Sequence, residues 1–120
     1  MTKNRWKNRI TEYTKEAGTY RPYFDDVIIT LAEILANRDD TAKQYRQTGS
    51  MPVVKYTNKG GNTNPTKNPI LSLWDDLNKT ALMYWRELGL TPAGLKRLDD
   101  TALKNEKKDA FADALGQIIG

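Results

Sequence analysis

The 120-residue sequence contains neither cysteine nor histidine. The missing cysteines exclude disulfides, thiolate nucleophiles and thiolate metal ligands, and they are compatible with a reducing compartment. The missing histidines exclude the usual zinc sites and Ser–His triads. Carboxylates remain, but they come mainly as Asp-Asp pairs near expected helix ends, where a solvated position is the simpler interpretation. We therefore predict no catalytic residues, no metal site and no cofactor, and we expect a protein that is not an enzyme.

Long apolar runs are also missing. No run approaches the roughly 18 residues that cross a membrane, and the N-terminal stretch "MTKNRWKNRI" lacks the apolar core of a signal peptide. Hydrophobic residues make up 38% of the chain and charged residues 28%. This balance and this length predict one modest, soluble, intracellular domain with a core of its own, and no membrane partner.

Acidic residues are absent from one long stretch of the chain. Residues 41–74 carry five basic side chains and no acid, and residues 1–21 carry six basic side chains against two acidic ones. Residues 22–40, between these two basic zones, have a net charge of −4, and the whole chain has a net charge of +4. Such clustering is typical of a protein that binds a polyanion, although an ordinary solvated surface would also fit these charges.

Apolar spacing predicts helices on both sides of a central interruption. A basic first helix is expected over residues 3–17, with a narrow apolar stripe and Gly18 as its stop. A second, longer helix is expected over residues 23–48, with two aspartates in its first turn, where the helix dipole favours anions. A third begins at Asn68-Pro69, a capping residue followed by proline, and Gly89 ends it. Thr91-Pro92 opens a fourth helix by the same signal.

The interruption itself is the segment "VVKYTNKGGNTNPTKNP", residues 53–69. Its first residues alternate as in a strand, "KGGN" has the composition of a turn, and each proline favours extended backbone before it. A β-hairpin or extended arm fits best, and a disordered surface loop is the alternative. Two isolated strands are barely stable in water, so we expect equivalent arms of neighbouring subunits to support one another.

The predicted fold is mainly α, with long helices forming an oligomeric helical core, a central β-hairpin or extended arm, and a basic N-terminal helix. The expected divisions are a basic helix or arm at 1–18, a helical oligomerisation core at 19–100 with the hairpin or arm at 51–69, and a charged tail at 101–120. A short amphipathic helix is expected in that tail, over "AFADALGQIIG".

The third helix is apolar on more than one side, so it is either central to the core or shared with a partner. We expect it to build an oligomer interface, with large anchors of the kind that dominate interfaces. The residues predicted for this interface are Trp74, Leu77, Tyr84, Trp85 and Leu88.

Basic side chains of the two positive zones are the candidates for nucleic-acid contact. Those of the N-terminal zone alternate along the chain, which suits phosphate contact from a flexible or loosely docked arm better than groove reading. The residues predicted to bind DNA are Lys3, Arg5, Lys7, Arg9, Lys55, Lys59 and Lys67.

Three pieces carry a resemblance to a known family: "VVKYTNKGG", "KNPILSLWDDLNK" and "ELGLTPAGLKRL". In their order and spacing, and with "AGTYRPYFDDVIITLAEIL" before them, residues 17 to 98 resemble a phage terminase small subunit. The resemblance implies a non-enzymatic, ring-forming protein of the host bacterial cytoplasm. Such a protein binds viral double-stranded DNA at the packaging site and recruits the large subunit, which holds the ATPase and the nuclease.

Two other functions remain open on the residues alone. A small helix-turn-helix DNA-binding regulator could begin at "GLTPAGLKRL", although no clear recognition helix follows residue 98. A purely structural phage protein, such as a connector, would have the helices and the oligomer without DNA binding.

Overall fold

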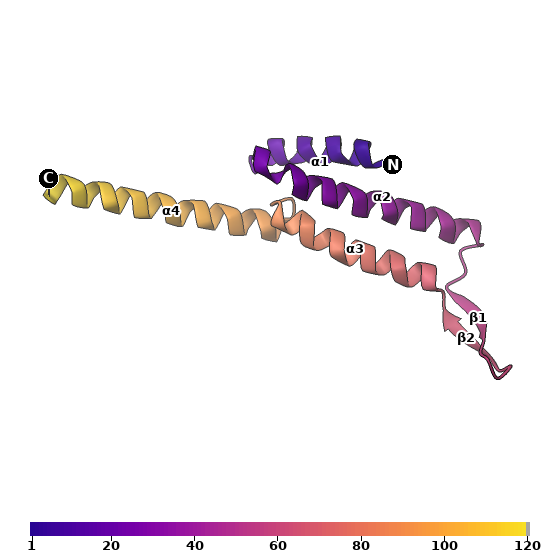
Figure 1. The fold of residues 1–120 in the computed structure, drawn as a ribbon. Helices are drawn as coiled ribbons and strands as arrows, with labels where there is room; N and C mark the ends of the chain where they lie inside the picture. The colour runs from indigo at the N-terminus through magenta and orange to yellow at the C-terminus, as the bar shows by residue number, and fades with distance from the viewer. Residues whose placement is uncertain (120) are drawn as a thin grey trace.

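The computed structural model describes residues 1–119, with side chains described except at 102–107, 109 and 117–119. Within this range the chain forms four α-helices, one short 3-10 helix and one β-hairpin (Figure 1). The order is α1 (Lys3–Ala17), η1 (Pro22–Phe24), α2 (Asp25–Gln47), β1 (Val53–Thr57), β2 (Thr63–Lys67), α3 (Pro69–Glu87) and α4 (Pro92–Ile119). The mainly α fold class with a central hairpin is confirmed. In the same range no helix combines the length and apolar character that a bilayer crossing requires.

Local sequence signals set the bounds of α1 and the start of α2. The Thr2 side chain accepts a hydrogen bond from the Arg5 amide, and Gly18 ends α1 in the left-handed conformation at φ 74°. The predicted bounds of this helix are confirmed. The helix predicted from residue 23 begins instead at Asp25, because Pro22 opens a 3-10 turn that precedes it.

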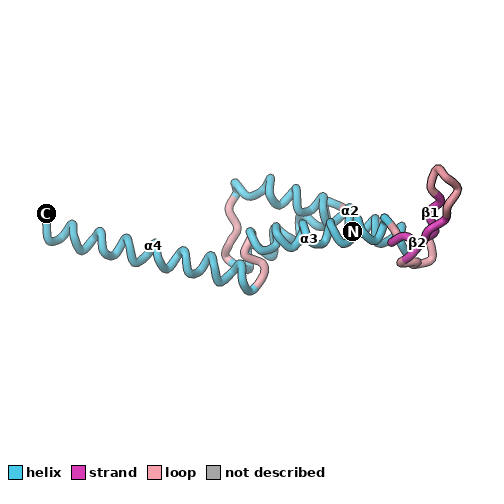
Figure 2. The backbone as a smooth tube through the Cα atoms, turned by 90° about the horizontal axis from the view of Figure 1, so that it is seen from below, coloured by secondary structure: helices cyan, strands magenta, loops and turns pink. Residues whose placement is uncertain are grey.

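Helix α2 is the centre of the fold, with α1 on one side and α3 on the other (Figures 1 and 2). It supplies four of the apolar side chains that are buried in the described part of the chain, whereas α3 supplies Ala81 and, at its C-cap, Leu88. The sequence left open whether α3 is central to the core. The structure gives that place to α2, and α3 buries only one side. The buried apolar residues are Ile10, Ile28, Leu31, Ala32, Leu35, Ala81 and Leu88.

The hairpin projects beyond the end of the helices (Figures 1 and 2). Its strands pair antiparallel, from Val53 opposite Lys67 to Thr57 opposite Thr63. Nine of its ten strand residues are exposed, and Val54 alone is half-buried. The predicted hairpin is confirmed in place of the disordered loop, and almost none of it packs on its own protomer.

Helix α4 leaves the bundle as a single long helix (Figure 1). Thr91 caps its first turn by accepting a hydrogen bond from the Gly94 amide at 3.0 Å, as the Thr-Pro signal predicted. The sequence predicted only a short helix near residues 110–120, because the charged segment before it has little apolar periodicity. That segment lacks proline and is rich in good helix formers, so the helix continues through it. The molecule measures 83 × 30 × 21 Å.

Candidate nucleic-acid interface

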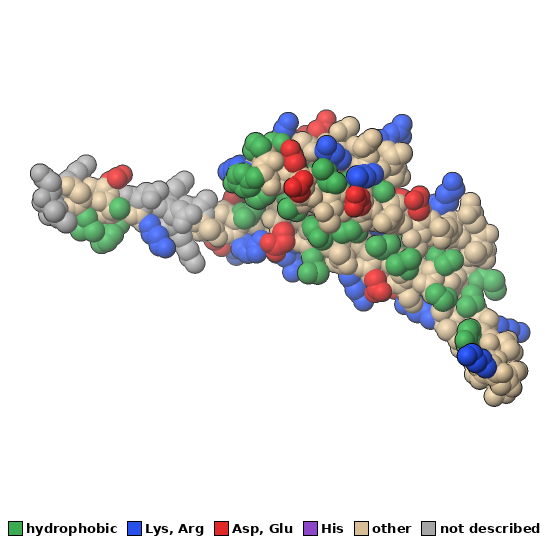
Figure 3. All heavy atoms as spheres, viewed as in Figure 1, with side chains coloured by type: hydrophobic (Ala, Val, Ile, Leu, Met, Phe, Trp, Pro, Cys, Tyr) green, Lys and Arg blue, Asp and Glu red, His purple; other side chains and the backbone are tan. Residues whose placement is uncertain are grey.

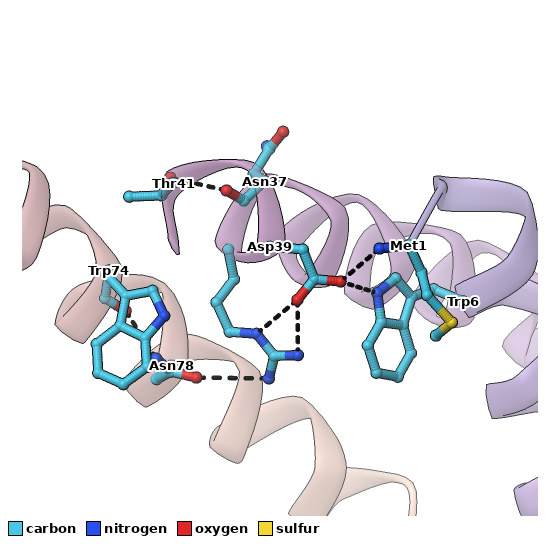
Figure 4. Close-up of polar contacts among 8 residues, drawn as sticks. Met1, Trp6, Asn37, Asp39, Thr41, Trp74 and Asn78 are labelled. Carbon is cyan, nitrogen blue, oxygen red and sulfur yellow. Dashed lines mark hydrogen bonds and ion pairs between the residues drawn. The ribbon is translucent and has the colours of Figure 1, made fainter. Parts of the chain in front are cut away.

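The basic helix α1 is held on α2 by a cluster centred on Asp39 (Figure 4). One oxygen of this carboxylate accepts hydrogen bonds from the Trp6 indole at 2.8 Å and from the Met1 amino group at 3.0 Å. Its other oxygen accepts from the Arg38 guanidinium at 3.0 Å, and Arg38 in turn reaches the Asn78 side chain of α3 at 3.5 Å. Three helices therefore meet at this one polar cluster.

Burial of the Asp39 carboxyl raises its pKa, but the hydrogen bonds donated by Trp6, the terminal amine and Arg38 lower it by more. The net result is a pKa below the usual aspartate value, so the cluster holds a carboxylate anion. Ile10 and Thr14 are also fully buried along the same helix. The expectation of a flexible or loosely docked N-terminal arm is therefore wrong for residues 3–17, since apolar packing and charged hydrogen bonds fix this helix.

The four predicted basic residues of α1 differ in what they contact. Lys3 forms an ion pair with Glu33 at 2.9 Å, and the Arg9 guanidinium lies over the Trp6 ring, 5.5 Å from its centroid. Lys7 is half-buried, whereas Arg5 is exposed. Docking of the helix therefore leaves Arg5 as the N-terminal basic residue best placed to contact a phosphate.

A groove of about 620 Å³ brings the start of α1 beside the second half of α2. Its lining includes Lys3 and Arg5 from α1 and Lys43 and Arg46 from α2, together with the α2 aspartates Asp39 and Asp40. Lys43 and Arg46 belong to the acid-free stretch of the sequence but were not among the residues predicted to bind DNA. They line this groove because of how α1 packs on α2, and this tertiary packing is not visible in the charge pattern of the sequence.

The hairpin tip carries Lys59 in a tightly bonded turn. The Asn58 side chain accepts hydrogen bonds from the amides of Gly60 and Asn62, each at 3.0 Å, and Gly61 has φ 83°. These contacts order the backbone beneath an exposed lysine. The far end of the hairpin shows basic and apolar side chains without an acid on the face drawn in Figure 3.

Lys55 and Lys67, the other predicted basic residues of the hairpin, differ in their contacts. Lys55 is exposed on β1, whereas Lys67 pairs with Asp75 of α3 at 3.0 Å. The base of the hairpin is fixed by Asn68, which is buried. Its side chain donates to the Met51 carbonyl at 2.9 Å and accepts from the Ile70 amide at 3.1 Å. One residue thus joins the loop before β1 to the first turn of α3.

The residues predicted for an oligomer interface occupy different environments. Leu88 is only 2% exposed in the protomer's own core, and Tyr84 and Trp85 pack against that core. Trp74 is 36% exposed and Leu77 is half-buried. Sequence reasoning missed other large apolar side chains that the structure exposes, because periodicity does not reveal which neighbour covers each position. On α3 and α4 these are Leu73, Leu82, Met83, Phe111 and Leu115.

The turn between α3 and α4 does not build the pair of crossing helices that a helix-turn-helix regulator requires. Gly89 and Thr91 form a tight connection, but α4 then runs away from the bundle (Figure 1). In the described part of the chain, residues 69–119 therefore provide no short recognition helix supported by its neighbour.

Comparison with known proteins gives one family. No curated protein and no solved structure matches the chain. The family described as "Phage terminase, small subunit" matches residues 2–105. This match extends across the basic helix, the bundle, the hairpin and the start of α4, so it covers more than the pieces that carried the resemblance. The chain belongs to the phage terminase small subunit family.

Proposed function

We propose that this protein binds viral double-stranded DNA at the packaging site as a ring oligomer, and that it recruits and regulates the large-subunit ATPase and nuclease. In this proposal it is non-catalytic and works in the host bacterial cytoplasm. Family membership supports the general role. The observation that carries the DNA-binding part is the grouping of basic side chains in the α1–α2 groove, with a further acid-free basic segment in the hairpin.

The DNA contacts argued from these residues are made to phosphates, which supply affinity and do not select the packaging-site sequence. Arg5, Lys43 and Arg46 are exposed around the groove, and Lys55 and Lys59 are exposed on the hairpin. The other predicted basic residues could contact DNA only after giving up an existing interaction or part of their burial. These are Lys3, Lys7, Arg9 and Lys67. Exposed lysines and arginines without a groove-reading helix suit sequence-independent attraction, and repetition around a ring would add avidity.

A salt titration of DNA binding tests this part of the proposal. We expect the affinity for duplex DNA to fall steeply with added salt, and the double variant Lys43→Gln, Arg46→Gln to reduce the slope by about one for each phosphate that is no longer neutralised. The double variant Lys79→Gln, Lys96→Gln removes the same charge at exposed positions away from the groove and hairpin, and it should bind nearly as the parent does. Equal reductions in both double variants would mean that net charge alone controls binding. An affinity that does not change with salt would contradict phosphate binding.

Oligomerisation in this proposal uses apolar side chains that the protomer leaves uncovered. Trp74 and Leu73 lie near the start of α3, and Met83 is 65% exposed toward its end. Phe111 and Leu115, one helical turn apart on α4, are 67% and 40% exposed. Burying such side chains between subunits is a common source of association energy.

Two double variants on the part of α4 outside the bundle test this interface. Phe111→Ser with Leu115→Ser should lower the oligomer mass while leaving the folded bundle intact, since both residues lie on the part of α4 outside it. Ala112→Ser with Ala114→Ser changes exposed positions of the same helix and should preserve the mass. An unchanged mass in the first double variant would remove α4 from the interface.

A further inference from the structure

The two edges of the hairpin differ in their free hydrogen-bonding groups. In an antiparallel pair, opposed residues alternate between those that exchange hydrogen bonds and those whose N–H and C=O groups point outward. The Asn58 amide bonds the Asn62 carbonyl and the Asn68 amide bonds the Pro52 carbonyl, each at 2.9 Å. In the observed register, the backbone N–H and C=O groups of the even-numbered β1 residues therefore point toward β2. The β1 residues whose backbone N–H and C=O groups point away from β2 are Val53, Lys55 and Thr57.

The corresponding outward positions on β2 are Thr63, Pro65 and Lys67. Proline has no N–H group, and it is tolerated in a strand where that group would point to solvent. Pro65 therefore removes the central donor of the β2 edge, which protects this edge from strand addition. The β1 edge keeps all of its outward donors and acceptors, and within the described residues the sheet has no third strand.

We propose that the β1 edge binds an extended, acidic segment of a partner protein, which joins the hairpin as a third strand. A second copy of this chain fits the edge poorly, and this replaces the expectation that arms of neighbouring subunits support one another by pairing. Head-to-tail pairing of β1 with a neighbour's β2 would lack the Pro65 donor. Pairing of two β1 strands about a twofold axis would bring together two arms that carry lysines and no acid, and like charges in opposed strands are destabilising.

Side-chain alternation defines the pattern that such a segment needs. Val53, Lys55 and Thr57 share one face of β1, and Val54 and Tyr56 share the other. A carboxylate opposite Lys55 would form a cross-strand ion pair, while apolar residues at the intervening positions would cover Val54 and the 62% exposed Tyr56. The expected segment therefore alternates acidic with apolar residues. This inference goes beyond DNA binding, since a nucleic acid does not provide the alternating amide ladder of a strand.

A synthetic peptide that alternates valine with aspartate or glutamate tests this docking site on the full chain. Amide hydrogen exchange should show new protection at Val53, Lys55 and Thr57, whose N–H groups face solvent without the peptide. The same peptide with lysine at every acidic position should bind at least about tenfold more weakly. Two further peptides, N-methylated on one or the other set of alternate amides, should differ, because only one set faces β1. Equal binding by these two peptides would overturn the proposal.

Protein variants separate the backbone edge from the charge. Lys55→Pro should weaken acidic-peptide binding by about tenfold or more, because it removes an outward donor that the hairpin itself does not use. Lys55→Thr removes the charge alone and should cost up to about fivefold. Retained protection at Val54 and Tyr56 verifies that each variant keeps the hairpin. Absence of protection at the three outward amides with acidic peptide overturns the proposal. It is also overturned if duplex DNA protects them, or if they become protected at high protein concentration without peptide.

Discussion

The rings of Trp6 and Trp85 meet edge to face, with 6.4 Å between their centroids and 67° between their planes. This contact joins α1 to α3. The same Trp6 side chain also donates its indole N–H to Asp39 of α2. An apolar and a polar interaction thus share one side chain. The basic helix is held to the bundle by both.

Trp85→Ala should therefore destabilise the protomer. Loss of its packing against Trp6 and the core should cost about 2–4 kcal/mol of unfolding free energy, measured by urea denaturation. Trp74→Ala is the matched control, because Trp74 is a tryptophan of the same helix with a 36% exposed side chain. This variant should cost about 1 kcal/mol of unfolding free energy and lower the oligomer mass. The assignment would be reversed if Trp85→Ala left stability unchanged and reduced the mass instead.

The lowered pKa of Asp39 predicts an acid-sensitive docking of α1. Because the folded state stabilises the carboxylate, its contribution is complete above the ordinary aspartate pKa of about 4 and is lost as the pH falls through the lower folded value. Asp39→Asn should cost about 1–2 kcal/mol near neutral pH and flatten the acid limb of the stability curve. Asp40→Asn removes the same charge at the exposed neighbour and should retain the Asp39 contribution to that limb. If both variants follow the parent's pH dependence, Asp39 is not the group responsible.

Gly94 allows α4 to start close against the end of α3. A Cβ atom at this position would overlap the Arg86 carbonyl oxygen, and backbone cannot move aside as a flexible side chain can. Gly94→Ala should cost about 1–3 kcal/mol and increase exchange at the α3–α4 junction. Gly116→Ala lies in the same helix with open space around the new methyl group, so it should stabilise α4 by up to about 1 kcal/mol. Equal effects of the two substitutions would contradict the close approach.

Pro65 is expected to keep the hairpin arms from pairing with one another. Pro65→Val supplies the missing outward donor, so it should increase concentration-dependent self-association, as measured by light scattering. Thr66→Val adds a similar β-branched residue at a position whose amide already faces β1, and it should not have this effect. If both variants self-associate equally, added hydrophobicity is the cause and the missing donor is not.

Local signals made the elements predictable. Asn68-Pro69, Gly18 and Thr91-Pro92 determine helix ends through contacts with their own neighbours, and the structure confirms each of them. The composition of "KGGN" likewise predicted the hairpin turn. These features depend on residues that lie close together in the chain.

Contacts between distant residues could not be predicted in this way. Trp6 and Asp39 are 33 positions apart, and neither carries a pattern that identifies the other. Periodicity marks Leu88 as apolar, but it does not reveal that the protomer's own core covers this residue. Similarly, the charge count identified the basic zones, but only tertiary packing brings Lys43 and Arg46 beside Arg5.

We propose above that this family member works as a DNA-binding ring. Native mass spectrometry of the full chain, with and without duplex DNA that contains the viral packaging site, tests it most directly. We expect one discrete, ring-sized multiple of the 13.7 kDa protomer and a second species heavier by the mass of the bound duplex. The second species should disappear as salt is added. A monomer or dimer with no species that contains DNA at low salt would contradict it.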